Sequence, residues 1–174
     1  MENVFKKLIL MGVVITLAGI AEAKTFRYAT TGDVLGLDPH ANNEGPTNTM
    51  KGNLYGRLLH RKADLSLEPD LATKWEKLDA TTWRFSLRQG VKFHNGNAFN
   101  ADDVVFSYNR QTQESSDMSF ALATVKEVKK VDDHTVDIIT KGPDPILLLN
   151  MPIFYIVDKE WTEANNAFEV VRAS

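Results

Sequence analysis

The chain has 174 residues, a formal net charge of −3 at pH 7 and no cysteine. Its 43% hydrophobic and 25% charged residues are typical of a globular protein with one ordinary domain and a real core. The sequence has no long basic run, so nucleic acid is not expected as a partner. Without cysteine, disulfide frameworks, thiolate zinc sites, thiol catalysis and lipid attachment through a cysteine are excluded.

The first residues have the layout of a secretory signal peptide. Lys6 and Lys7 form a positive segment, residues 8–20 are an apolar run, and Ala21-Glu22-Ala23 is a small-residue cleavage site. The alternative is a transmembrane anchor, which needs about 20 apolar residues, more than this run supplies. We therefore predict a signal peptide over residues 1–23, cleaved after Ala23, and a mature chain that is periplasmic.

The mature chain begins with short extended segments. Residues 25–30 alternate in the manner of a strand, and residues 32–39 form a loop with two glycines and a proline. A second short strand is expected over residues 58–61, followed by a surface turn over residues 62–67. In the loop, Asp38 is expected to hold local backbone through an Asx-turn in preference to contacting a ligand.

A helix is expected over residues 46–55. Pro46 suits the first turn of a helix. Met50, Leu54 and the nearby Leu58 are spaced four residues apart, which predicts an apolar helix face.

The densest local signals follow Leu71. Trp83, Phe85 and Leu87 alternate with polar residues, which predicts a half-buried strand over residues 83–88. Gln89-Gly90 offers a turn, and the alternation resumes in a second predicted strand over residues 91–93. Asn95-Gly96 predicts a tight turn, because both residues tolerate a positive φ.

A helix is predicted to start after Asn100. Its side chain can cap the helix, and Asp102 and Asp103 place negative charge in the first turn. The apolar stripe of this helix consists of Val104, Val105 and Tyr108, with Phe106 beside it.

The last third of the chain mixes strands and short helices. The elements expected there are a polar loop (111–119), a small apolar segment (118–124), a two-stranded hairpin (125–131 and 135–140), a buried helical turn (146–151), a strand covered on both faces (153–157) and a helix capped by Asp158 (159–167).

Residues 71–110 resemble, in order and spacing, the signature segment of the family 5 solute-binding proteins of bacterial ABC transporters. This family includes oligopeptide-, dipeptide- and nickel-binding proteins, and a weaker resemblance extends from Thr25 to Lys159. It implies a mixed α/β fold, the N-terminal lobe of a two-lobed periplasmic-binding-protein fold, over residues 24–174. Because the elements of residues 58–140 are more local in the sequence, we expect this segment to fold as a subdomain. The signature residues are expected to be structural: Trp83, Phe85, Leu87, Arg88, Gly90, Val91, Phe93, Gly96, Asp103 and Val104.

The resemblance also implies where a ligand is met. In the family, the loop after the first strand lies near the mouth of the ligand cleft, which makes Asp33, Gly36 and Leu37 candidate ligand-binding residues. Asp33 is a candidate partner for a ligand's ammonium group. The connection after the signature helix can carry an aromatic residue that faces a bound peptide. Phe120 is the local candidate, although burial in the core is the favoured interpretation of it.

The residues offer little support for catalysis, a metal or another cofactor. The histidines have no second ligand at helical spacing, so no metal site is expected at His40, His60, His94 or His134. Because nickel binding occurs in the family, contact of one histidine with a bound metal complex is the alternative. Asp102-Asp103 could serve acid–base chemistry, but a role at the positive end of a helix is favoured. We therefore do not expect an enzyme.

Together these observations predict a periplasmic substrate-binding component that hands a small peptide or related solute to an inner-membrane ABC permease. It would be a monomer that meets the membrane only through the transporter and binds no nucleic acid. The alternatives are a small secreted interaction protein and, with less support, a secreted hydrolase. Family members are much longer, and the residues after Phe168 match nothing in the family, so we also expect a truncated product, for example from a frameshift.

Overall fold

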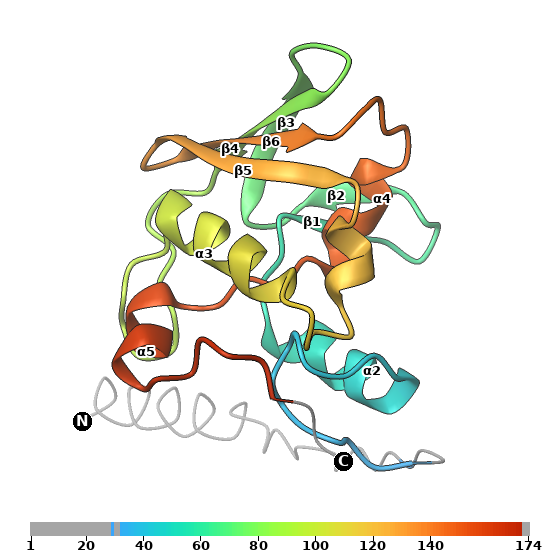
Figure 1. The fold of residues 1–174 in the computed structure, drawn as a ribbon, viewed down its shortest axis with the longest axis vertical. Coiled ribbons are helices and arrows are strands. Elements are labelled where there is room, and N and C mark those ends of the chain that lie inside the picture. The colour runs from blue at the N-terminus through green and yellow to red at the C-terminus, as the bar shows by residue number, and fades with distance from the viewer. Residues whose placement is uncertain (1–28, 30–31, 172–174) are drawn as a thin grey trace, which may run out of the picture. The chain divides into compact units, whose positions relative to one another are not determined.

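The computed structural model describes residue 29 and residues 32–171 (Figure 1). The predicted signal peptide and, apart from Ala29, the predicted strand over residues 25–30 lie outside these residues. The described elements are α2 (Gly45–Leu54), β1 (Leu59–Arg61), β2 (Leu67–Pro69), β3 (Ala72–Lys77), β4 (Thr82–Leu87), α3 (Ala101–Gln111), β5 (Val125–Asp132), β6 (Thr135–Thr140), α4 (Leu147–Asn150) and α5 (Lys159–Ala164), with 3-10 turns at Ser119–Leu122 and Met151–Ile153.

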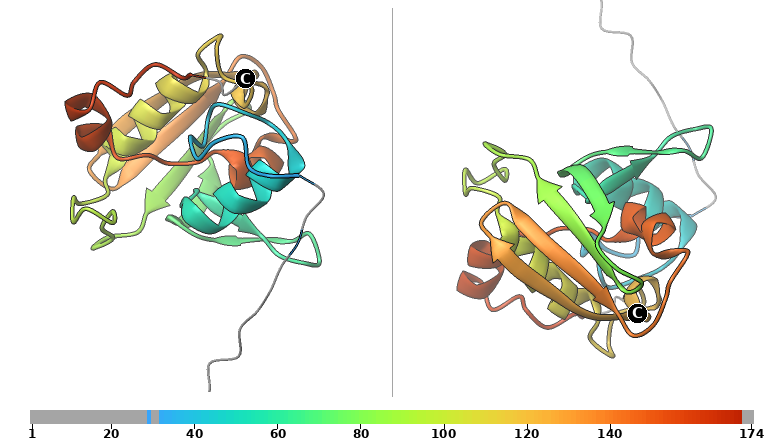
Figure 2. Two further views of the ribbon diagram at one scale, coloured as in Figure 1. Left: turned by 90° about the horizontal axis from the view of Figure 1, so that it is seen from below. Right: turned by 90° about the horizontal axis from the view of Figure 1, so that it is seen from above.

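The main sheet has the strand order β3-β4-β6-β5, and each neighbouring pair is antiparallel. The predicted hairpin is confirmed as β5 and β6. Helix α3 lies along one face of this sheet (Figure 2) and packs on β5 and β6. The core between them includes Phe85 and Leu87 from β4, Val104 from α3, and Val128, Val136 and Ile138 from the hairpin, all buried. Strands β1 and β2 form a separate antiparallel pair.

Strand β4 confirms the predicted alternation, but β3 was not anticipated. Among the described strands, β3 lies at the edge of the main sheet and pairs with β4 alone, and most of its residues are exposed. An edge strand of this kind carries mostly polar side chains, so its apolar alternation is weak. The predicted strand over residues 91–93 is wrong, because this segment forms only a single bridge pair, Lys92 with Ala98. Both predicted turns are present, with positive φ at Gly90 (73°) and Gly96 (96°) but not at Asn95.

Helix α3 begins as the sequence predicts. The Asn100 side chain accepts a hydrogen bond from the Asp102 N–H (2.7 Å), and the Asp103 carboxylate accepts one from the Asn100 N–H (2.9 Å). This reciprocal capping satisfies donors that the first turn of a helix leaves without partners.

Helix α2 is confirmed, but its predicted apolar face is wrong. Met50 and Leu54 are 42% and 43% exposed, whereas Thr47 and Lys51 are buried. The reason is that the inner face of α2 makes polar contacts with the preceding loop. Thr47 accepts a hydrogen bond from the Leu35 N–H, and the Lys51 ammonium donates to the Asn42 carbonyl.

The predicted strand over residues 153–157 is also wrong. Its burial is as expected, since Phe154, Tyr155 and Ile156 are at most 2% exposed. However, the backbone is bonded by partners outside any strand, such as the Gly56 carbonyl, which accepts from the Ile156 N–H (2.9 Å). A continuous apolar run therefore predicted burial correctly and the element incorrectly.

The last helices are shorter than predicted. The helical turn over residues 146–151 is α4 with the 3-10 turn that follows, and Ile146 is 53% exposed rather than buried. Asp158 caps α5 by accepting from the Trp161 N–H (3.1 Å), as predicted. The helix ends at Ala164 instead of Ala167, because Asn166 has a positive φ of 53°.

Candidate functional site

A cavity of about 600 Å³ lies where the 37–39 segment, the end of α2, the 91–95 turn, α3 and α5 approach one another. Its wall is mostly apolar and includes Tyr55, Phe93, Phe99, Ile156 and Trp161. The charged side chains of Asp38 and Arg110 also line it.

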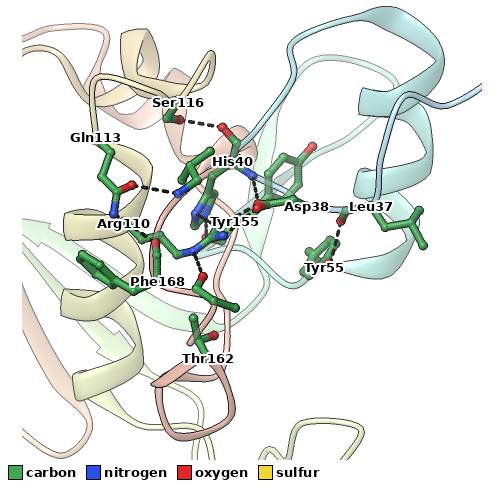
Figure 3. A network of polar contacts seen from close by, with 12 residues as sticks. Leu37, Asp38, His40, Tyr55, Arg110, Gln113, Ser116, Tyr155, Thr162 and Phe168 are labelled. Carbon is green, nitrogen blue, oxygen red and sulfur yellow. Dashed lines mark hydrogen bonds and ion pairs between the residues drawn. The ribbon is translucent and has the colours of Figure 1, made fainter. Parts of the chain in front are cut away.

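Arg110, in the last turn of α3, joins segments that are far apart in the sequence (Figure 3). Its side chain is 5% exposed and forms a two-pronged ion pair with Asp38, at 2.8 Å from Nη1 and 2.6 Å from Nη2. Its Nε donates to the Ala167 carbonyl (3.0 Å), and Nη1 lies 3.1 Å from His40 Nδ1. A planar guanidinium suits this arrangement because its N–H groups form a rigid fork.

His40 is fully buried beside this ion pair. Its Nε2 lies 2.9 Å from the Tyr155 carbonyl, which can only accept, so Nε2 carries the proton and Nδ1 accepts from Arg110. Burial lowers the pKa of His40 to about 4, and the Arg110 cation acts in the same direction. The imidazole is therefore neutral at pH 7. The Ser116 hydroxyl fixes the same residue from another side, donating to the His40 carbonyl (2.7 Å; Figure 3).

Asp38 also bonds its own loop. The His40 N–H donates to the Asp38 carboxylate (3.0 Å), which confirms the predicted Asx-turn. Burial by itself would raise the pKa of Asp38, but the hydrogen bonds from Arg110 and the His40 N–H outweigh it and lower the pKa. The carboxylate is therefore charged at neutral pH and accepts three hydrogen bonds from the protein.

The loop that precedes Asp38, residues 32–37, is here named the 32–37 loop. The Tyr55 hydroxyl donates to the Leu37 carbonyl (2.8 Å; Figure 3), and the Leu35 N–H donates to the Thr47 hydroxyl (3.1 Å). The Val34 N–H donates to the Asp33 carboxylate (2.8 Å). The loop is thus held at its middle and its end by side chains of α2 and of the residue that follows it.

The sequence-predicted ligand residues fall into two groups. Asp33 is exposed, Gly36 has open space around the position of a Cβ atom, and Leu37 is 55% exposed and lines the cavity. Phe120 lies on the 3-10 turn at Ser119–Leu122 and is not part of the cavity wall. Its favoured burial is wrong, since it is 53% exposed.

The predicted structural residues lie mostly in or against the core. Phe85, Leu87, Asp103 and Val104 are at most 4% exposed, and Trp83, Val91 and Phe93 pack against the core as partly buried side chains. Arg88 is exposed, and its Nε donates to the Asp70 carbonyl (3.0 Å).

The acidic pair at the start of α3 is divided between two structural roles. The Asp102 carboxylate accepts from the Lys130 ammonium (2.8 Å), and Asp103 accepts from the N–H groups of Asn100 and Lys159. Burial raises the pKa of Asp103. Both carboxylates are therefore already bonded within the protein.

Two further searches cover only the residues that the structure describes. Within them, no group of three or more histidine, cysteine, aspartate or glutamate side chains is placed to hold a metal ion. None of the helices in the same part of the chain has both the length and the apolar character needed to cross a membrane.

Comparison with known proteins places the chain in a class, the extracellular solute-binding proteins. The family described as "Bacterial extracellular solute-binding proteins, family 5 Middle" matches residues 66–171, and the chain belongs to this family. The predicted membership and the predicted mixed α/β fold of a periplasmic binding protein are confirmed. Members of this family are binding proteins rather than enzymes.

Three proteins illustrate the similarity. The chain is 34% identical to the dipeptide-binding protein of Escherichia coli (strain K12), over 91% of this chain and 34% of that protein. A Helicobacter pylori periplasmic binding protein, DppA, solved with the peptide STSA, gives a TM-score of 0.68 at 26% identity, with 79% of this chain and 32% of that chain covered. MoaA of A. tumefaciens R10, solved with mannopinic acid, gives 0.69 at 33% identity, with 76% and 29% covered. The chain thus spans about a third of the length of these relatives.

Arg110, His40 and Tyr55 were not anticipated as site residues. Arg110 and Asp38 are 72 residues apart in the sequence, and Tyr55 and Leu37 are 18 apart. No local pattern connects residues at such separations.

Proposed function

We propose that this protein works as the periplasmic substrate-binding component of an ABC transporter and binds short peptides or related small solutes. The family match over residues 66–171 carries this proposal, supported by the 34% identity to a dipeptide-binding protein. The protein is exported by a signal peptide cleaved after Ala23 and delivers its ligand to an inner-membrane permease. It binds as a monomer, performs no covalent chemistry and meets the membrane only through the transporter.

The 32–37 loop is the part of the described chain best suited to meet a peptide. Within the described residues, no group donates a hydrogen bond to the carbonyls of Asp33, Val34, Leu35 or Gly36. An extended peptide can therefore donate its own N–H groups to these carbonyls, as in the addition of a strand to an exposed edge. The open space at Gly36 permits close approach of a ligand backbone.

Side chains of the same loop add two contacts. Asp33 presents an exposed carboxylate for the ligand's ammonium group, and Leu37 presents an exposed apolar side chain at the cavity. Phe120 lies elsewhere on the surface, where its exposed ring is available to a larger ligand.

The matched residues determine the scaffold more than the choice of ligand. The relatives named above carry a dipeptide, a tetrapeptide and mannopinic acid in their names or structures, yet all resemble this chain to a similar degree. Similarity at this level therefore follows the fold and does not by itself identify the ligand. We favour peptides because the dipeptide-binding relative matches the largest share of this chain among the three.

Thermal unfolding and isothermal titration calorimetry of the whole protein test this proposal. The ligands are dialanine and the peptide Ser-Thr-Ser-Ala, with mannopinic acid as a non-peptide comparison. A peptide present at 100 times its Kd is expected to stabilise the folded protein by about 2.7 kcal/mol. Stabilisation by mannopinic acid alone would redirect the proposal to another solute, and the absence of binding by both peptides would refute it.

A further inference from the structure

We propose that Arg110 and Tyr55 are positioning residues that hold the 32–37 loop in its ligand-binding shape. The inference rests on the proposed function, since it concerns the loop assigned there to the ligand. It assigns the two side chains a role in affinity, in addition to their contribution to the stability of the fold.

The guanidinium of Arg110 forms its hydrogen bonds with groups of the protein itself. Nη2 and Nη1 donate to the Asp38 carboxylate, Nη1 also reaches His40, and Nε donates to Ala167. With its side chain only 5% exposed, Arg110 has little surface to offer a solute. What it does hold is Asp38, the residue that follows the 32–37 loop. Arg110 therefore fixes the point at which the loop joins the folded body of the protein.

Tyr55 holds the adjacent residue from a different element. It follows directly after α2, and its hydroxyl donates to the Leu37 carbonyl at 2.8 Å. Its ring lies against the ring of Tyr155, with 6.3 Å between centroids and a 59° angle between planes. The Tyr155 carbonyl in turn accepts from His40, the residue beside the Asp38–Arg110 ion pair. Figure 3 shows these side chains converging on the end of the loop.

Fixed and open groups alternate along the loop in a way that suits recognition. The Leu35 N–H, the Leu37 carbonyl and the Asp38 carboxylate are bonded to the protein. The carbonyls of residues 33–36 receive no hydrogen bond from the described residues. The carbonyls that remain for a ligand therefore lie between bonded positions of the loop. Binding of a ligand then carries no additional loss of backbone entropy. Ordering one backbone residue on binding would weaken affinity by about tenfold.

The chain offers a matched control. Arg84 of β4 forms the same two-pronged ion pair with Asp137 of β6, with both contacts at 2.8 Å, and it lies on the main sheet away from the 32–37 loop. Replacing Arg84 by lysine removes a fork of the same geometry, in a side chain that is 35% exposed against 5% for Arg110, without releasing the loop. Arg110→Lys keeps the positive charge but loses the fork. Tyr55→Phe removes one hydroxyl and keeps the ring, so it tests the same idea with little risk to folding.

The experiment measures backbone ¹⁵N order parameters of residues 34–37 in the free protein, and the Kd for dialanine and Ser-Thr-Ser-Ala. Arg110→Lys is expected to lower the loop order parameters from about 0.85 to below about 0.6. It should also weaken peptide binding about tenfold, as the loss of one ordered residue requires. Tyr55→Phe is expected to produce the same changes to a smaller extent. Arg84→Lys should lower Tm while it leaves both the loop and the Kd within twofold of the original protein.

Each outcome decides the matter. If Arg110→Lys and Tyr55→Phe leave loop order and Kd as Arg84→Lys does, their role is structural only and the inference is overturned. If Arg110→Lys does not fold, the result with Tyr55→Phe decides alone. If neither peptide binds the unsubstituted protein, the proposed function fails, while the order parameters still show whether Arg110 and Tyr55 position the loop.

Discussion

Acidification should destabilise this protein through one buried histidine. His40 is fully buried, and burial lowers its pKa from 6.5 to about 4, with the cations of Arg110 and Lys51 acting in the same direction. The Tyr155 carbonyl and the Asp38 carboxylate oppose the shift but do not cancel it. Between pH 6.5 and pH 4 the unfolded chain therefore binds a proton that the folded protein excludes.

The sign and the size of the effect follow from this difference. Because the unfolded state binds more protons in that window, the free energy of unfolding falls as the pH falls from 6.5 to 4. A pKa lowered from 6.5 to about 4 corresponds to a loss of about 3 kcal/mol across the window. The lowered pKa of Asp38 acts at a lower pH, below its ordinary value of 3.8, so the two effects are separable.

Urea denaturation at pH 7, 5.5 and 4.5 measures the prediction. The variant His40→Gln can still donate to the Tyr155 carbonyl but cannot titrate, so we expect a loss of about 1–3 kcal/mol at pH 7 and a flatter pH dependence. The control is His60→Gln in β1, where the side chain is 41% exposed and lies 4.0 Å from Glu68. This control should keep the original slope. An equal slope in His40→Gln and the original protein would show that another group is responsible.

Three further substitutions test the core, a helix cap and the loop. Phe85→Ala, at a fully buried position of β4, should lower the free energy of unfolding in urea by about 3–5 kcal/mol. Asn100→Ala removes half of the capping box of α3 and should cost about 1 kcal/mol in the same assay. Asp33→Asn should weaken dialanine binding about two- to fivefold in calorimetry, as expected for an exposed charge pair. The same substitution should leave binding of N-acetylated dialanine unchanged, and an equal loss for both ligands would rule out contact with the ammonium group.

Local signals predicted local structure well. The cap of α3 could be predicted from the sequence, because Asn100 and Asp103 are three residues apart and bond each other's backbone. The turn at Gly96 and the hairpin of β5 and β6 could be predicted for the same reason, since the residues that pair in them are close in the sequence.

Elements whose character depends on distant partners were predicted less well. The apolar spacing of Met50 and Leu54 indicated a buried face for α2. The buried face instead contains Thr47 and Lys51, because these side chains form hydrogen bonds with the loop before α2. The run that ends at Val157 is buried as expected, but within the described residues it forms a single isolated bridge pair, Tyr155 with Arg57, and no strand ladder. Apolar composition reports burial, and the type of element depends on what supplies the hydrogen bonds.

Asp33 and Asp38, in the segment before α2, show how much of the candidate ligand site the sequence predicts. From the sequence, Asp38 is expected to form an Asx-turn, and Asp33 is a candidate partner for a ligand's ammonium group. The structure bears out the Asx-turn, in which Asp38 accepts the His40 N–H, and adds an ion pair with Arg110, which is 72 residues away in the sequence. Asp33 accepts only the Val34 N–H among the described residues and remains exposed. A carboxylate has about four acceptor positions, so Asp33 keeps most of its capacity for a ligand's ammonium group, while Asp38 keeps the loop in place.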